Sequence, residues 1–185
     1  MKTNVKEFLS KLNEGVKLDN VSWDSVGNPQ SDIRWTQSAD DQNFFNACVE
    51  KMQHRDVQSV LDIACGFGNF VSTCNNNGIA AFGVDPLPPS KDSFYVGTFA
   101  TVVENSELLG DYKFDCITAH NILHGKYHSQ EELKKLFDFF KKHAKYVIIT
   151  EPRENSSELL SGLKLEHAFA SSHRSTFHKL YKVEG

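Results

Sequence analysis

The segment from Val60 to Phe70 constrains the fold of this chain more than any other stretch. It begins with a short apolar run, Val60 to Ala64, of the kind that forms a strand buried on both faces. The run breaks at Cys65-Gly66-Phe67-Gly68, and a helical pattern begins at Asn69. Because glycine has no Cβ, glycines at a strand-to-helix turn let a ligand approach the backbone closely. Open α/β sheets bind ligands at the carboxyl ends of their strands, so this segment predicts a nucleotide-type site.

The residues around the glycines narrow the choice of ligand. A dinucleotide fingerprint requires a third glycine at position 71, where the chain has Val71, and this disfavours a nicotinamide or flavin cofactor. No lysine follows the glycines, which excludes a phosphate-binding P-loop. The octet from Leu61 to Gly68, with Asp62 ahead of the glycines, resembles the first motif of the class I S-adenosylmethionine-dependent methyltransferases.

This resemblance implies a three-layer, Rossmann-like α/β fold with a seven-stranded, mostly parallel sheet whose last strand is antiparallel. It covers residues 40–185 as one methyltransferase domain and leaves 1–39 as an N-terminal cap segment. The hydrophobic pattern agrees with this organisation. Strands are expected at 60–64, 79–84, 94–96, 114–119, 146–150, 163–169 and 177–183, and helices at 5–12, 40–54, 69–77, 129–142 and 155–162.

Two acidic residues are the expected anchors of the cofactor, S-adenosyl-L-methionine. The resemblance assigns Asp62 to the methionyl amino group, and a carboxylate is a suitable partner for a cation. Asp85 ends the second predicted strand, at about the distance from the glycines where an acid accepts hydrogen bonds from both ribose hydroxyls. The predicted cofactor-binding residues are Asp62, Ala64, Cys65, Gly66, Gly68, Asp85, Pro86, Thr98, Phe99 and His120.

Thr98 and Phe99 fall where the family contacts adenine. The family commonly has an aspartate or asparagine there, and Thr98 departs from that pattern. Adenine recognition by the threonine hydroxyl, by backbone groups or by stacking on Phe99 are all open alternatives.

The segment from Phe114 to Gly125 resembles the fourth motif of the family, which lies beside the methyl group being transferred. Methyl transfer is an in-line displacement, so the protein must align the acceptor and, where needed, remove its proton. His120 at the predicted strand end is the expected base, and His124 is a second candidate. Both O- and N-methylation are compatible with these residues.

Three further residues are expected to contact the acceptor. Glu151 ends a predicted strand beside the expected substrate entrance, and Arg34 and Trp35 lie in an irregular stretch that must pack on the domain or cover something. Residues near the last predicted hairpin, including His178, are interpreted as solvated loop residues.

No metal site is predicted. His120, His124 and His128 recur every four residues, but Gly125 interrupts the pattern and Ser129 begins a new helix. The three imidazoles are therefore not expected to share one helix face.

Composition favours a small-molecule substrate. The net charge of −4 disfavours a basic groove for nucleic acid, and no apolar run is long enough to cross a membrane. The four cysteines lack metal-ligand spacing and suit a cytoplasmic protein with reduced thiols. The expected acceptor is a small polar metabolite or a sugar-type molecule.

Two alternatives differ in function class. One is a protein of the same fold that binds S-adenosylmethionine without transferring its methyl group. The other is an RNA or DNA methyltransferase. Amino-methylating DNA members of the family carry an Asn/Asp-Pro-Pro-aromatic motif after the fourth strand, whereas this chain has His120-Asn121-Ile122-Leu123.

Overall fold

One mixed sheet organises the molecule. The computed structural model describes residues 3–15, 39–86, 88–120, 128–150, 156–169 and 178–185. Within these ranges seven strands pair in the order β3-β2-β1-β4-β5-β7-β6. They are β1 (Ser59–Ile63), β2 (Ala80–Asp85), β3 (Phe94–Val96), β4 (Phe114–Ala119), β5 (Ala144–Thr150), β6 (Leu163–Ala168) and β7 (His178–Val183). Strands β1 to β5 pair in parallel, and β7 inserts antiparallel between β5 and β6, as predicted.

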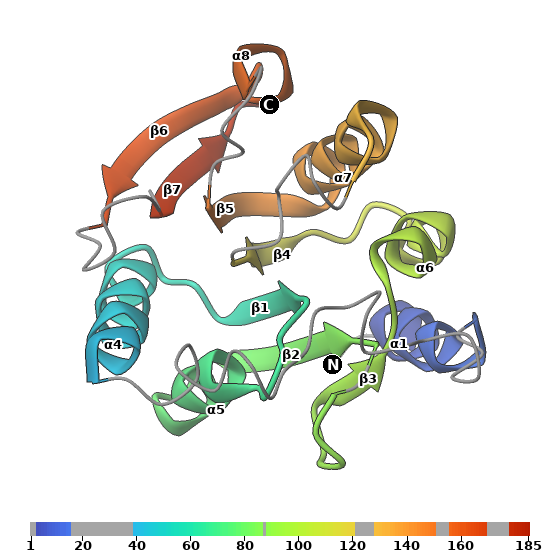
Figure 1. Cartoon of the computed structure of the whole chain (residues 1–185), viewed down its shortest axis with the longest axis horizontal. Helices are drawn as coiled ribbons and strands as arrows, with labels where there is room; N and C mark the ends of the chain where they lie inside the picture. The colour runs from blue at the N-terminus through green and yellow to red at the C-terminus, as the bar shows by residue number, and fades with distance from the viewer. Residues whose placement is uncertain (1–2, 16–38, 87, 121–127, 151–155, 170–177) are drawn as a thin grey trace.

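Helices cover both faces of this sheet (Figure 1). One side carries α1 (Thr3–Gly15), α6 (Phe99–Glu104) and α7 (Gln130–His143), and the other carries α4 (Ala39–Gln53) and α5 (Asn69–Asn76). Two short helical segments complete the described elements, η2 (Ser106–Leu109) and α8 (Ser156–Leu159). None of the helices in the described ranges has the length and apolarity that a membrane span requires.

Strand alternation divides the core into two halves. In β1, Leu61 and Ile63 pack with α1, α6 and α7, whereas Val60 packs with α4 and α5. In β4, Ile117 joins the first half and Cys116 joins the second, so this strand is buried on both faces. The continuous apolar patterns of the central strands follow from this double burial.

The ends of α7 show why its boundaries are readable from the sequence. The Ser129 hydroxyl accepts a hydrogen bond from the Glu132 N–H, and the Glu132 carboxylate accepts one from the Ser129 N–H, as the capping-box pattern predicts. Lys141, Lys142 and His143 lie in the last turn, where the helix dipole favours positive charge.

Helix α6 is absent from the sequence prediction, which expects no helix between the strands at 94–96 and 114–119. In the structure Thr98 is the N-cap of α6, and its hydroxyl accepts a hydrogen bond from the Thr101 N–H at 3.2 Å. Helix α1 packs against β3, α6 and η2, and its Phe8 and Leu12 side chains are completely buried in the core. The first helix therefore belongs to the packed body of the molecule.

Candidate active site

The turn that follows β1 has a strained backbone. Ala64, Gly66 and Gly68 all have positive φ angles, of 58°, 54° and 74°. For alanine this left-handed conformation costs roughly 1–2 kcal/mol, and such strain is concentrated at ligand sites. This geometry agrees with the predicted strand-to-helix turn, in which the glycines take a backbone conformation that other residues rarely adopt.

Gly66 joins this turn to the end of β2. Its N–H donates a hydrogen bond of 3.0 Å to Oδ2 of Asp85. Gly66 is exposed, and a Cβ placed on it would meet no atom of the described part of the chain within 4 Å. The backbone at Gly66 therefore borders open space, with a half-buried carboxylate beside it.

Asp62 lies beneath this turn, within β1. Its side chain is buried, and its Oδ1 accepts a hydrogen bond of 2.6 Å from the Thr118 hydroxyl. Burial raises the pKa of Asp62 to about 7, the Thr118 hydrogen bond opposes the rise, and the charge of Asp85 adds to it. Asp62 is thus a buried acid without a cation among its hydrogen-bond partners in the described residues.

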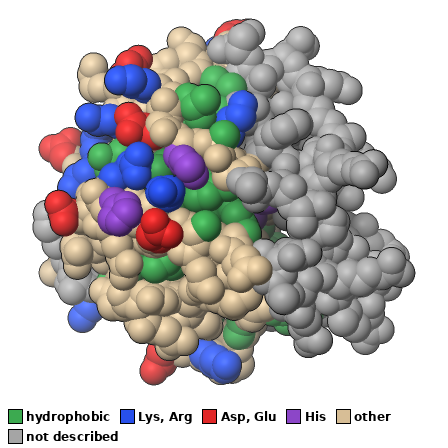
Figure 2. All heavy atoms as spheres, turned by 90° about the vertical axis from the view of Figure 1, so that its left-hand side faces the viewer, with side chains coloured by type: hydrophobic (Ala, Val, Ile, Leu, Met, Phe, Trp, Pro, Cys, Tyr) green, Lys and Arg blue, Asp and Glu red, His purple; other side chains and the backbone are tan. Residues whose placement is uncertain are grey.

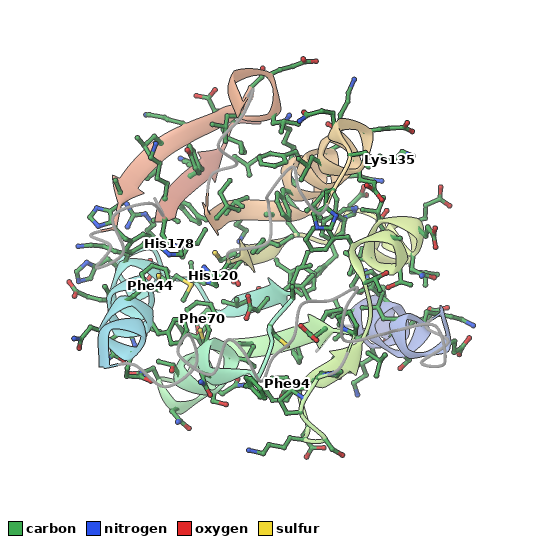
Figure 3. The ribbon with its side chains drawn as sticks, in the orientation of Figure 1. Phe44, Phe70, Phe94, His120, Lys135 and His178 are labelled. Carbon is green, nitrogen blue, oxygen red and sulfur yellow. The ribbon has the colours of Figure 1, made fainter. Side chains whose placement is uncertain are left out.

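His120 follows β4 on the face covered by α4 and α5. Its ring makes edge contacts with Phe44 and Phe70, at centroid distances of 5.4 and 5.0 Å. His178, the first residue of β7, lies 5.7 Å from His120 between ring centroids. Figure 3 shows these four side chains converging where α4, α5, β4 and β7 meet. We call this group, with Phe45 and Phe169, the aromatic cluster.

Comparison with known proteins identifies the family. The sequence profile of the family described as "methyltransferase domain" matches residues 33–181, most of the chain. The chain belongs to the methyltransferase-domain family. By sequence it has no significant match among curated proteins.

Solved structures share the fold of this methyltransferase. The protein WbdD, solved with a kinase inhibitor, matches at a TM-score of 0.58 with 17% identity over 86% of this chain, which spans only 44% of that chain. A Burkholderia thailandensis 1,6-didemethyltoxoflavin-N1-methyltransferase matches at a TM-score of 0.64 with 13% identity over 86% of this chain and 85% of that one. An S-adenosylmethionine-dependent methyltransferase from Clostridium acetobutylicum matches at a TM-score of 0.62 with 13% identity over 88% of this chain and 99% of that one. The family match and the sheet order together confirm the predicted methyltransferase family and its class I fold. Two of these neighbours are described with S-adenosylmethionine or S-adenosylhomocysteine, the cofactor that the sequence predicts here.

The residues of the methyltransferase fit this cofactor. Open space borders Gly66, and the Asp85 carboxylate lies beside it at the carboxyl edge of the sheet. Asp62 supplies a buried carboxyl group near this edge, and an ammonium group is the partner that would favour its ionised form. A nucleoside with a cationic tail would therefore find the Asp85 carboxylate for its sugar and the Asp62 carboxyl group for its cation.

Thr98 and Phe99 lie at the predicted adenine side, and the structure gives each of them a structural contact. The Thr98 hydroxyl caps α6, and the Phe99 ring stacks on His128 at a centroid distance of 4.4 Å. His128 directly precedes the N-cap of α7, so the stack joins the chain after β3 to the start of α7. Sequence reasoning does not pair these two rings, because 28 residues separate Phe99 from His128.

Gly68 and Gly83 differ from Gly66 in what surrounds them. A Cβ placed on Gly68 would overlap the ring of Phe94, and one on Gly83 would lie 2.7 Å from the Cys65 sulfur. These two glycines make room for protein side chains at the carboxyl edge of β1 and β2. Among the glycines of the turn, Gly66 is the one whose missing Cβ leaves space open.

We expect Gly68→Ala to destabilise the methyltransferase by roughly 2–4 kcal/mol, because overpacking against Phe94 adds to the cost of a positive φ. Chemical denaturation measures the loss. Gly78→Ala is the matched control, because Gly78 has a φ of 80° but no neighbour within 4 Å, and we expect it to lose only about 1–2 kcal/mol. Equal losses of unfolding free energy in the two variants would show that the Phe94 ring moves aside without a measurable loss of stability.

Other predicted site residues fall into two groups. Cys65 and Pro86 lie half-buried in the turns after β1 and β2, and burial raises the pKa of the Cys65 thiol far above its ordinary value. Four predicted residues lie outside the described ranges: Arg34, Trp35, His124 and Glu151.

The sequence interpretation of His178 as a solvated residue is wrong. His178 is only 8% exposed, and its ring lies 4.2 Å from that of Phe44 between centroids. The antiparallel pairing of β7 with β5 brings His178 beside Thr150, at the carboxyl edge of the sheet. Among the described residues no three histidine, cysteine or acidic side chains are grouped as metal ligands require.

Proposed function

We propose that this methyltransferase transfers the methyl group of S-adenosylmethionine to an oxygen or nitrogen atom of a small metabolite. The observation that carries the proposal is the hydrogen bond from Gly66 to Asp85, which holds an acid beside exposed, Cβ-free backbone at the carboxyl edge of β1 and β2. The buried Asp62 lies within the same edge of the sheet.

Each part of the cofactor has a proposed partner. Asp85 accepts hydrogen bonds from the two ribose hydroxyls, and Asp62 pairs with the methionyl ammonium group. Gly66 and its neighbours Ala64 and Cys65 provide close backbone approach. Pro86, Thr98 and Phe99 border the adenine, where Phe99 contributes an aromatic surface. The bound cofactor supplies an electrophilic methyl group on a sulfonium that is a good leaving group.

His120 is proposed to orient the acceptor. Burial, with a further contribution from His178, lowers the pKa of His120 to about 3, so the imidazole is neutral at physiological pH. A group with so low a pKa is a weak proton acceptor, but it still accepts a hydrogen bond. Alignment therefore contributes more than proton abstraction at this residue. His124, Glu151, Arg34 and Trp35 are retained as proposed acceptor contacts.

A small molecule is favoured over nucleic acid. The face of α4 and β6 mixes basic, acidic and histidine side chains (Figure 2). Lys51 lies 3.8 Å from Glu50, and Arg55 lies 3.3 Å from Glu166. Such paired charges do not form the single-sign surface that nucleic acid binding requires.

Two further proposals concern the chain as a whole. We propose that residues 1–39 cap the methyltransferase domain, with α1 packed into its core. We also propose a cytoplasmic location, which the four free thiols support because disulfides are rare there.

The proposed function is tested with the isotopically labelled cofactor. We expect the methyltransferase, incubated with a cell extract and methyl-labelled S-adenosylmethionine, to yield one small labelled product in mass spectrometry. Asp85→Ala should lose at least about 100-fold in this labelling, since a charge-assisted pair of hydrogen bonds to ribose contributes roughly 3 kcal/mol. Cofactor binding without any labelled product would instead support a non-catalytic binding protein, and labelled RNA or DNA would support a nucleic-acid methyltransferase.

A further inference from the structure

The aromatic cluster surrounds the end of β4 with rings from α4, α5, β7 and the residue after β6. Phe44 and Phe45 come from α4 and Phe70 from α5, and Phe169 follows β6. Phe44 alone contacts His120, His178 and Phe169 at centroid distances of 5.4, 4.2 and 5.5 Å. Figure 3 shows Phe44 lying between α4 and the two histidines. The cluster is therefore continuous from α4 to the end of β4.

His120 has unused hydrogen-bonding capacity inside this cluster. Both ring nitrogens are buried, and neither has a hydrogen-bond partner among the described residues. A neutral imidazole offers one N–H donor and one lone pair, and buried polar atoms of this kind are nearly always paired. A bound molecule that supplies a hydrogen bond would satisfy one of these nitrogens.

The chemistry of the cluster limits what that molecule is. Four of its six members are phenylalanines, and burial lowers the pKa of His120 to about 3 and of His178 to about 4. Both imidazoles are therefore neutral at pH 7, and the six described side chains of the cluster offer no charged partner to a ligand. A sugar carries many hydroxyl groups that need partners, and the four phenylalanine rings of the cluster supply none.

Resting on the proposed function, we propose that the aromatic cluster is the acceptor site and that the acceptor is an uncharged phenolic or heteroaromatic compound. Its accepting O–H or N–H forms a hydrogen bond with the lone pair of His120. The oxygen or nitrogen then forms a bond to the methyl carbon as the carbon–sulfur bond breaks, and that electron pair stays on sulfur. The proton of the accepting atom is then lost to bulk water as the methylated product leaves the site.

Phe44, Phe45 and His120 are the half-buried members of the cluster, whereas Phe70, Phe169 and His178 are buried. Of the two half-buried phenylalanines, Phe44 lies closer to the His120 ring, at 5.4 Å against 6.3 Å between centroids. A planar ligand that displaces the Phe44 ring replaces its edge contact with His120 by an equivalent aromatic contact. Replacing the Phe44 ring by the ring of the ligand preserves the packing of the cluster and adds the hydrogen bond that His120 lacks.

Binding of three matched probes tests the acceptor class. The full chain is saturated with S-adenosylhomocysteine and titrated with 2-naphthol, 2-naphthoate or methyl α-D-glucopyranoside by ligand-observed NMR. We expect 2-naphthol to bind at least about tenfold more tightly than either other probe, since an unpaired charge or hydroxyl costs more than about 1.4 kcal/mol. Equal or tighter binding of the carboxylate or the sugar would overturn the proposal.

His120→Phe locates the probe, because it removes the hydrogen bond and retains an aromatic ring. We expect 2-naphthol affinity to fall about tenfold while the affinity for S-adenosylhomocysteine stays within about twofold. His143→Phe is the matched control, since His143 is also buried with an unpartnered Nε2 among the described residues, but lies at the end of α7. An unchanged affinity in His120→Phe would overturn the acceptor site, whereas failure of the wild type to bind S-adenosylhomocysteine would overturn the proposed function itself.

Discussion

Gly66→Val is expected to abolish cofactor binding without unfolding the protein. The valine side chain would fill the open space beside Gly66 and Asp85, where the cofactor is proposed to lie. We expect the affinity for S-adenosylhomocysteine to fall at least about 100-fold, which corresponds to roughly 3 kcal/mol. Calorimetric titration measures this loss directly.

Gly110→Val separates this effect from backbone strain. Gly110 has a φ of 56°, against 54° for Gly66, and a Cβ at Gly110 also meets no atom of the described residues within 4 Å. Its ψ of −125° lies outside the left-handed helical region, in a conformation that residues other than glycine rarely adopt, so Gly110→Val should lose at least about 1–2 kcal/mol of stability. Only Gly66→Val should lose cofactor affinity, and equal affinity losses in both variants would contradict the assigned role of the glycine turn.

Asp62→Asn is expected to stabilise the cofactor-free protein at high pH. The pKa of Asp62 is about 7 in the folded protein, against an ordinary value of 3.8. A raised folded-state pKa means that folding favours the protonated acid, so its contribution to stability is full below pH 3.8 and is lost as pH rises through about 7. The ionised form at pH 8 costs about 4 kcal/mol, by the pKa difference.

The asparagine side chain keeps an oxygen that accepts the Thr118 hydrogen bond but carries no charge. Denaturation curves should therefore show a variant that is several kcal/mol more stable than the wild type at pH 8 and nearly equal to it at pH 4. A difference that does not depend on pH would show that Asp62 ionises normally in the folded chain.

The same substitution should weaken the cofactor site. The ammonium group of the cofactor pairs with ionised Asp62, so we expect Asp62→Asn to lose roughly 10- to 100-fold in affinity at pH 8. Wild-type affinity should fall by up to about tenfold per pH unit below pH 7, because Asp62 must then release a proton on binding. The affinity of the variant should not change over this range.

Local patterns made several elements predictable. The predicted range of β4, residues 114–119, coincides with the structure, because an apolar run buried on both faces admits no helix-like alternation. The start of α7 is marked by Ser129 and Glu132, which lie three residues apart and satisfy each other's backbone groups. The glycine turn and Asp85 were predictable for a different reason: an acid that ends the second strand about 20 residues after such a turn is a known pattern of nucleotide sites.

The remaining features depend on contacts between distant residues. Gly68 accommodates the ring of Phe94, and His178 is buried because β7 inserts beside β5 rather than at the sheet edge. Helix α6 is too short to show helical periodicity, so its capping box at Thr98 and Thr101 is its only local signal. The aromatic cluster unites α4, α5, β4 and β7, and no sequence spacing relates these elements.

A crystal structure of this methyltransferase with S-adenosylhomocysteine tests the central claim most directly. We predict that the ribose hydroxyls lie within hydrogen-bond distance of Asp85, that the homocysteine amine faces Asp62, and that the sulfur points toward the aromatic cluster. A ligand bound away from Gly66, or an Asp85 carboxylate turned away from the ribose, would contradict it.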